Sequence, residues 1–170
     1  MPTRGGWIAC VSIGLVTAAA SCSNDSATAT ATDTVRTSAL LAPIQNDFED
    51  GTLQGWIPRG PVTLTNTTEQ AFAGTHSLKT TGRTAGFHGP SLNVTSQLTK
   101  GATYQVGVSV RLVSGSAPTT IRVTMQRTLG GGLQQFDTIA QNTNVTDGAW
   151  VTLTVVAGVP ATSRAETVTW

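Results

Sequence analysis

The sequence predicts an all-β fold, a two-sheet antiparallel β-sandwich of jelly-roll type, from two observations. Apolar residues alternate with polar residues along several short segments, which is the period of a half-buried strand. Turn-forming glycines separate these segments at intervals of roughly 8–12 residues, as in sandwiches and barrels. The composition agrees, because Thr, Val, Ser and Gly are abundant and charged residues are only 11% of the chain. No segment shows the periodicity of an amphipathic helix.

Residues 1–22 are expected to be an export leader. Arg4 supplies a positive charge, and residues 7–20 form an apolar stretch that is short for a transmembrane helix. Small residues precede Cys22, and two interpretations stay open. The segment is either an ordinary secretory signal peptide or a bacterial lipoprotein signal in which Cys22 carries the lipid. Both predict a bacterial protein that is secreted or held at the cell surface, with a lipid anchor as its one link to the membrane.

Residues 23–43 are predicted to be a tether. This segment is rich in Ala, Thr and Ser and lacks aromatic residues, so it cannot bury enough apolar surface to offset its ordering entropy. The folded domain is assigned to residues 44–170. Because Cys10 and Cys22 are the only cysteines, a domain without its leader has no disulfide and depends on core area or a bound cation.

The clearest strand is predicted at residues 104–112, where apolar side chains occupy every second position. Residues 121–126 and 150–157 alternate in the same way, and shorter strands are expected at 62–66, 77–81, 90–95 and 135–141. Gly-containing turns at 100–101, 114–115, 130–132 and 147–148 separate them. Residues 166–170 form a further strand-like run that stops at the end of the chain, so we expect the last strands of the domain to be missing.

The charge balance argues against a nucleic-acid partner. The chain has 10 Lys and Arg residues and 9 Asp and Glu residues, and its sequence shows no cluster of basic residues. Catalysis is not expected either. Glycoside hydrolysis needs two carboxylates that face each other across a cleft, whereas the carboxylates beyond the tether stand at turns and strand ends outside any hydrolase motif. No Ser/His/Asp arrangement and no phosphate-binding glycine loop is present. The chain is therefore predicted not to be an enzyme.

Six short motifs follow one another in the order found in a known family. They are FEDG, GW and PRG over residues 48–60, AGTHSL at 73–78, TGRT with FHG over 81–89, GATY at 101–104, FDTIA at 136–140 and GAW at 148–150. Together they resemble the family 22 carbohydrate-binding modules, which belong to a superfamily shared with families 4 and 9. Each motif alone is weak, and the resemblance rests on their order.

The resemblance implies a binding face for an extended xylan chain. Sugar rings present C–H faces that pack on flat aromatic side chains, while their hydroxyl groups accept hydrogen bonds from planar polar groups. The matching positions are Arg59, Phe87, His88, Phe136 and Trp170. Phe87 stands where the family has Trp, and Phe136 where Tyr is usual, so weaker binding or an altered preference is expected. Affinity in the millimolar to high-micromolar range would follow.

The resemblance also implies a structural Ca²⁺, with Glu49 as its carboxylate and loop carbonyls near residues 74–77 completing the shell. Modules of this kind usually precede a family 10 xylanase domain, so a tethered catalytic domain is an expected partner beside xylan or another β-1,4-linked glycan. Two alternatives remain open. One is a surface lipoprotein that captures another β-glucan or serves adhesion; the other is a sandwich without a ligand that acts as a spacer.

Overall fold

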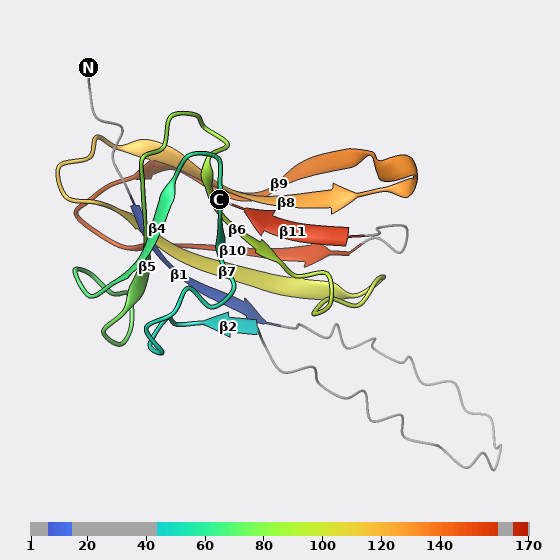
Figure 1. Ribbon diagram of the computed structural model, residues 1–170, viewed down its shortest axis with the longest axis horizontal. Coiled ribbons are helices and arrows are strands. Elements are labelled where there is room, and N and C mark those ends of the chain that lie inside the picture. Colours follow the sequence, from blue (N-terminus) through green and yellow to red (C-terminus); the bar gives the residue numbers. More distant parts are fainter. Residues whose placement is uncertain (1–6, 15–43, 160–164, 170) are drawn as a thin grey trace, which may run out of the picture.

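The chain forms two antiparallel β-sheets packed face to face, in a computed structural model that describes residues 7–14, 44–159 and 165–169. Sheet A has the strand order β10-β7-β1-β5-β4, with β2 paired to β1, and sheet B has the order β3-β6-β11-β8-β9. Figure 1 shows the two layers, with β8, β9 and β11 in one and β1, β7 and β10 in the other. The predicted all-β sandwich is confirmed.

The strands of sheet A are β1 (Trp7–Gly14), β2 (Ile44–Asn46), β4 (Thr63–Thr67), β5 (Ser77–Thr81), β7 (Thr103–Leu112) and β10 (Val151–Gly158). Those of sheet B are β3 (Ile57–Arg59), β6 (Gly89–Asn93), β8 (Thr119–Thr128), β9 (Gln134–Val145) and β11 (Ala165–Thr169), with a short 3₁₀ turn, Gly130–Gly132, between β8 and β9. Every predicted strand beyond the tether has a counterpart here. Within the described ranges no helix is long and apolar enough to cross a membrane.

The core forms where the alternating faces of the two sheets meet. Val106, Val108 and Val110 of β7 face Ile121 and Val123 of β8, and all five are buried. Trp56 and Tyr104 are buried as well, as expected for residues beside a turn and at the start of an alternating strand. Burial of these side chains, at about 1.5–3 kcal/mol each, is what holds the layers together.

The N-terminal segment differs from expectation. We expect residues 1–22 to be a leader outside the domain, yet Trp7–Gly14 forms β1, an interior strand of sheet A. Its composition explains the difference, because a short apolar run rich in branched side chains suits both a signal peptide and a buried strand. Cleavage of the leader stays a prediction. Cys22, the tether over 23–43 and Trp170 lie outside the described residues.

Candidate functional site

Three side chains from separate strands meet on the outer face of sheet B. Gln126 of β8 and Phe136 of β9 are register partners, and directly opposed residues of an antiparallel pair lie on the same face. The Arg59 Nη1 donates a hydrogen bond of 2.8 Å to Gln126 Oε1. Its guanidinium carbon lies 5.1 Å from the centre of the Phe136 ring, which is a cation–π contact. We call Arg59, Gln126 and Phe136 the sheet B trio.

The sheet B trio is open to solvent. Phe136 is 49% exposed, whereas Val123 and Met125, which alternate with Gln126 along β8, are buried. Neither of the two ion pairs found in the described residues involves Arg59. An exposed ring with a guanidinium over it and an amide beside it offers an apolar surface next to forked N–H donors. This is the chemistry that a pyranose ring requires.

Phe87 and His88 stand beside the trio on the loop between β5 and β6. The loop is braced by its own side chains: Arg83 Nη2 donates to the Gly86 carbonyl at 2.8 Å, and the Ala85 amide donates to His88 Nδ1 at 3.1 Å. Phe87 is 67% exposed, and its ring meets that of His88 edge-on, with centres 4.7 Å apart. Phe87 is therefore an outward-facing ring, and Arg83 braces the turn through the Gly86 carbonyl.

His88 connects this loop to the strand that carries Arg59. Its ring lies against Gly60, where a Cβ would stand 2.3 Å from His88 Cδ2. Gly60 also has φ +80°, a conformation that side chains rarely adopt. Because Nδ1 accepts a hydrogen bond from an amide, the neutral ring carries its proton on Nε2. The His88 ring thus lies between the end of β3 and the Phe87 ring.

Sequence reasoning missed two residues on this face. Gln126 was placed in an alternating strand but not assigned to the site, and Ile57, a register partner of Ser91 on β6, is 59% exposed. The strand alternation already indicates that Gln126 points away from the core. What the sequence does not give is the register that sets Gln126 opposite Phe136. The sequence-predicted residues Arg59, Phe87, His88 and Phe136 are all described, and all lie on or beside sheet B.

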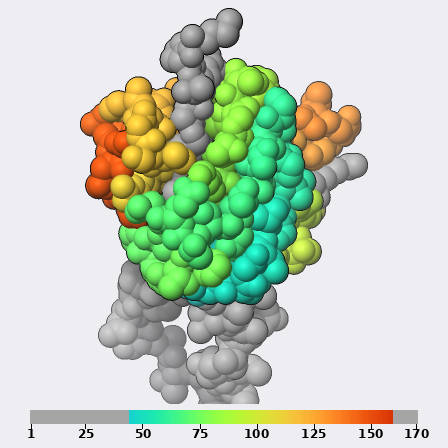
Figure 2. All heavy atoms as spheres, turned by 60° about the vertical axis from the view of Figure 1, so that its left-hand side comes forward, coloured from blue at the N-terminus to red at the C-terminus, as the bar shows by residue number. Residues whose placement is uncertain are grey.

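Glu49 is held by a loop at the other end of the sandwich. Its carboxylate accepts hydrogen bonds from the Thr75 amide (2.8 Å), the Thr75 hydroxyl (2.8 Å) and the His76 amide (2.7 Å). The His76 amide, followed by the Thr75 hydroxyl and amide, holds the pKa of Glu49 below its ordinary value. In Figure 2 the atoms near residues 50 and 75 form one continuous surface. Glu49 therefore clamps the loop over residues 74–76 to the N-terminal turn.

The surroundings of Glu49 do not fit a calcium shell. Ca²⁺ takes six to eight oxygen ligands, whereas the loop turns N–H and O–H donors toward the carboxylate. The backbone of Gly74 also packs closely against the Glu49 carboxylate, since a Cβ at Gly74 would lie 2.4 Å from Glu49 Oε1. This leaves no space for an ion between the two residues. Among the described residues no group of three or more His, Cys, Asp or Glu could hold a metal. Calcium binding remains a prediction for experiment.

A cavity of about 290 Å³ lies on the opposite side of β8 and β9 from the sheet B trio. Met125, Asp137 and Ile139 line it together with Arg127, whose guanidinium forms an ion pair with Asp137. Residues 155–158 of β10 close the other wall. The lining of this cavity does not include the side chains of the trio, so the cavity and the candidate site are separate.

Comparison with known proteins identifies the family. The profile of the family described as "Carbohydrate binding domain" matches residues 44–169. The chain belongs to this family of carbohydrate-binding domains. The matched region contains the sheet B trio and the loop with Phe87 and His88, and it begins at the first residue of β2.

Solved structures similar to this chain include family 22 modules of the carbohydrate-binding family. The N-terminal CBM22-1–CBM22-2 tandem domain of Paenibacillus barcinonensis Xyn10C is 38% identical with a TM-score of 0.70, and the match covers 73% of this chain and 37% of that one. The C-terminal family 22 module of Clostridium thermocellum Xyn10B is 28% identical with a TM-score of 0.67, over 72% and 78% of the two chains. The predicted family 22 resemblance is confirmed.

Curated relatives are much longer proteins. An endo-1,4-beta-xylanase C of Paenibacillus barcinonensis is 42% identical over 110 residues, which are 65% of this chain and 10% of the relative. An endo-1,4-beta-xylanase A of Thermoanaerobacterium saccharolyticum is 44% identical over 109 residues, 63% of this chain and 9% of the relative. The carbohydrate-binding domain thus spans about a tenth of the length of the curated relatives that it matches.

Proposed function

We propose that this chain binds xylan, or a related β-1,4-linked glycan, on the outer face of sheet B and does not hydrolyse it. The observation that carries the proposal is the sheet B trio, in which an exposed ring, a guanidinium and an amide stand together. The exposed Phe87 beside it offers a second ring. Two rings on one open surface suit a ligand that runs across several strands.

The names of related proteins support the ligand class. A solved structure described as the CBM22-1 xylan-binding domain of Paenibacillus barcinonensis Xyn10C is 37% identical, with a TM-score of 0.63, and covers 72% of this chain. Two of the curated relatives are named endo-1,4-beta-xylanases. We therefore propose that the domain works outside the cell in a larger protein, where it holds a catalytic domain close to its polysaccharide and raises the effective substrate concentration.

Isothermal titration with xylohexaose, cellohexaose and laminarihexaose tests the proposal. Heat of binding with xylohexaose, together with an unchanged oligosaccharide on chromatography, is the expected result. Binding of laminarihexaose alone would instead support capture of another β-glucan. No heat with any of the three would favour the spacer, although a spacer gives no reason for Arg59 to lie over an exposed ring without a carboxylate partner in the described residues.

We further propose export of the chain, and lipid attachment at Cys22 is the finer form of that proposal. Intact-mass measurement of the membrane and culture fractions separates the two possibilities. A diacylglyceryl adduct on a mature N-terminal Cys22 supports the lipoprotein, and an unmodified shortened chain in the medium supports simple secretion.

A further inference from the structure

The loop between β5 and β6 is closed by a single histidine. His88 bonds both backbone groups of Ala85: its amide donates to the Ala85 carbonyl at 3.2 Å, and its Nδ1 accepts from the Ala85 amide at 3.1 Å. The Thr84 hydroxyl also lies 3.0 Å from Nδ1. Phe87 stands inside this four-residue turn. The turn that carries the exposed Phe87 ring is therefore closed by a side-chain atom as well as by the backbone.

The protonation state of Nδ1 decides whether the side-chain bond exists. A backbone amide is a donor, so Nδ1 accepts from Ala85 only while it carries no proton. In the protonated ring both nitrogens are donors, and the Nδ1 proton would then face the Ala85 amide proton. The Thr84 hydroxyl can rotate to accept from Nδ1, but the amide cannot change its role. Protonation of His88 thus removes one of the two bonds that close the turn.

The His88 ring also packs against the strand that carries Arg59. A Cβ on Gly60 would stand 2.3 Å from His88 Cδ2 and 2.8 Å from Nε2, so the ring lies directly on the Gly60 backbone. Gly60 follows Arg59 in the chain, and the Arg59 guanidinium lies over the Phe136 ring. The Phe87 ring meets the same imidazole edge-on. One ring thus contacts both segments that carry predicted sugar contacts.

The charged groups on the elements around His88 are cations. Arg83 stands on the same loop and bonds the Gly86 carbonyl, and Arg59 stands on β3 next to Gly60. β6, which begins directly after His88, carries no charged residue. Within the described ranges no carboxylate forms a hydrogen bond or an ion pair with His88. A proton on the ring would therefore gain no ion pair in exchange for the bond that it breaks.

We propose that His88 is a positioning residue of the glycan-binding face and that it acts only in its neutral form. The inference rests on the proposed function. Neutral His88 closes the turn that presents Phe87 and packs against the end of β3, whereas protonated His88 releases the Ala85 amide and leaves Phe87 less well held. Xylohexaose has no ionisable group, so the pH dependence of binding comes from the protein. Affinity is highest at alkaline pH and falls as the pH drops through the range in which histidine takes up a proton.

Calorimetry with xylohexaose at pH 8 and pH 5.5 tests this dependence. The affinity of the unsubstituted chain should be about two- to tenfold lower at pH 5.5, which is the change that the loss of one hydrogen bond produces. His88→Asn places an amide oxygen near the position of Nδ1, and this acceptor does not titrate. Binding by His88→Asn should therefore be the same at both pH values, and His88→Ala, which has no acceptor, should bind weakly at both.

His76 is the matched control, because it is the other of the two histidines in the chain. Its ring lies 2.6 Å from Asn66 Oδ1, away from sheet B. His76→Asn should keep the pH dependence of the unsubstituted chain. Equal affinity of the unsubstituted chain at the two pH values, or a pH dependence that survives in His88→Asn, would overturn the proposal.

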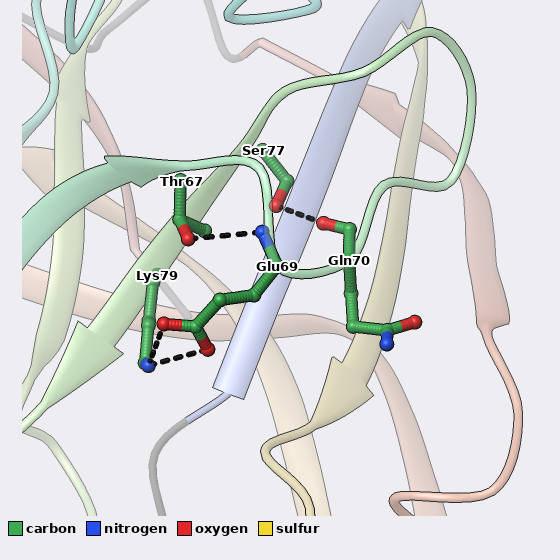
Figure 3. A network of polar contacts seen from close by, with 5 residues as sticks. All are labelled: Thr67, Glu69, Gln70, Ser77 and Lys79. Atoms are coloured by element: carbon green, nitrogen blue, oxygen red, sulfur yellow. Dashed lines mark hydrogen bonds and ion pairs between the residues drawn. The ribbon is translucent and has the colours of Figure 1, made fainter.

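Residues 67–70, at the start of the loop that crosses sheet A, provide an internal control for pH. Glu69 forms an ion pair of 2.6 Å with Lys79, and its amide donates to Thr67 Oγ1 at 3.2 Å. Ser77 Oγ donates to the Gln70 carbonyl at 2.5 Å. Figure 3 shows this network, in which no histidine takes part. Its amide shifts should stay constant between pH 8 and pH 5.5.

NMR of the ¹⁵N-labelled chain without sugar separates this inference from the proposed function. At pH 8 the ¹⁵N shift of His88 Nδ1 should be that of an unprotonated ring nitrogen. As the pH falls to 5.5, the amide shifts of Ala85 and Phe87 should follow the titration of the His88 ring, and those of residues 67–70 should not. Amides of Ala85 and Phe87 that ignore the titration, or a ring that takes up no proton in this range, would overturn the proposal whether or not the chain binds sugar. Absence of heat with xylohexaose at both pH values, together with the expected shifts, would instead count against the proposed function alone.

Discussion

The substitution Phe136→Ala removes the exposed ring of the sheet B trio and is the sharpest perturbation of the proposed binding face. An aromatic side chain of this kind covers about 150–250 Å², and Phe136 is 49% exposed, so about 100 Å² is available to a ligand. A pyranose covers between half and all of that area. At about 25 cal/mol per Å² the loss is about 1.3–2.5 kcal/mol, a rise in Kd of roughly 10- to 60-fold.

Titration calorimetry with xylohexaose measures this loss, and Phe72→Ala is the matched control. Phe72 is 50% exposed, almost the same as Phe136, but it lies on the loop that crosses sheet A. The two variants therefore make the same chemical change at equal exposure on opposite sheets. Equal affinities of Phe136→Ala and the unsubstituted protein, or an equal loss in both variants, would refute the assignment. Thermal melts should show both variants folded.

The contacts of Arg59, Gly60 and Glu49 lead to four further predictions. Arg59→Lys keeps the charge but loses the fork that reaches Gln126 and should weaken xylohexaose binding by about tenfold, since the lost contacts are worth on the order of 1.5 kcal/mol; unchanged calorimetry would argue against a ligand role. Gly60→Ala drives a methyl group into the His88 ring and should lower the melting temperature, which an unaltered melt would contradict. The pKa of Glu49 lies below its ordinary value of 4.5, so the stabilisation that its ionised carboxylate gives is complete above that pH and is lost as pH falls through the lower folded value; urea melts between pH 6 and 3 should show a shallower fall for Glu49→Gln, and parallel curves would exclude this role. Calcium should raise the melting temperature only if Glu49 can exchange its N–H partners for the ion, and a rise that is preserved in Glu49→Gln would place any calcium elsewhere.

The long strands beyond the tether could be predicted because apolar and polar residues alternate along them. Residues 104–112 and 121–126 alternate strongly enough that period alone fixes their type, and the structure places β7 and β8 there. β3 was not predicted, because it has only three residues, Ile57–Arg59, and includes Pro58. A segment so short carries no period to detect.

Most residues of the site could be predicted from the sequence, but the way in which they come together could not. Arg59, Phe87 and Phe136 could be assigned because the motif resemblance covers them, and the two rings prove to be exposed. Gln126 could not, since its role depends on the register between β8 and β9, which includes a bulge between Val123 and Thr124. Register is a long-range property that one strand's sequence does not encode.

β1 shows a different limit of sequence reasoning. An apolar segment of eight residues near a positive charge satisfies the rules for a leader, and the same residues satisfy the rules for a buried strand. Both interpretations need only a short apolar run, so the composition of residues 7–14 does not separate them.

The most direct test of the central claim is to map the ligand contacts by NMR. Amide shifts of ¹⁵N-labelled protein titrated with xylohexaose should change most around Arg59, Gln126 and Phe136, with smaller changes near Phe87 and none on β4 and β7 of sheet A. Saturable shifts centred on sheet A instead, with the sheet B trio unmoved, would contradict the claim that sheet B carries the glycan.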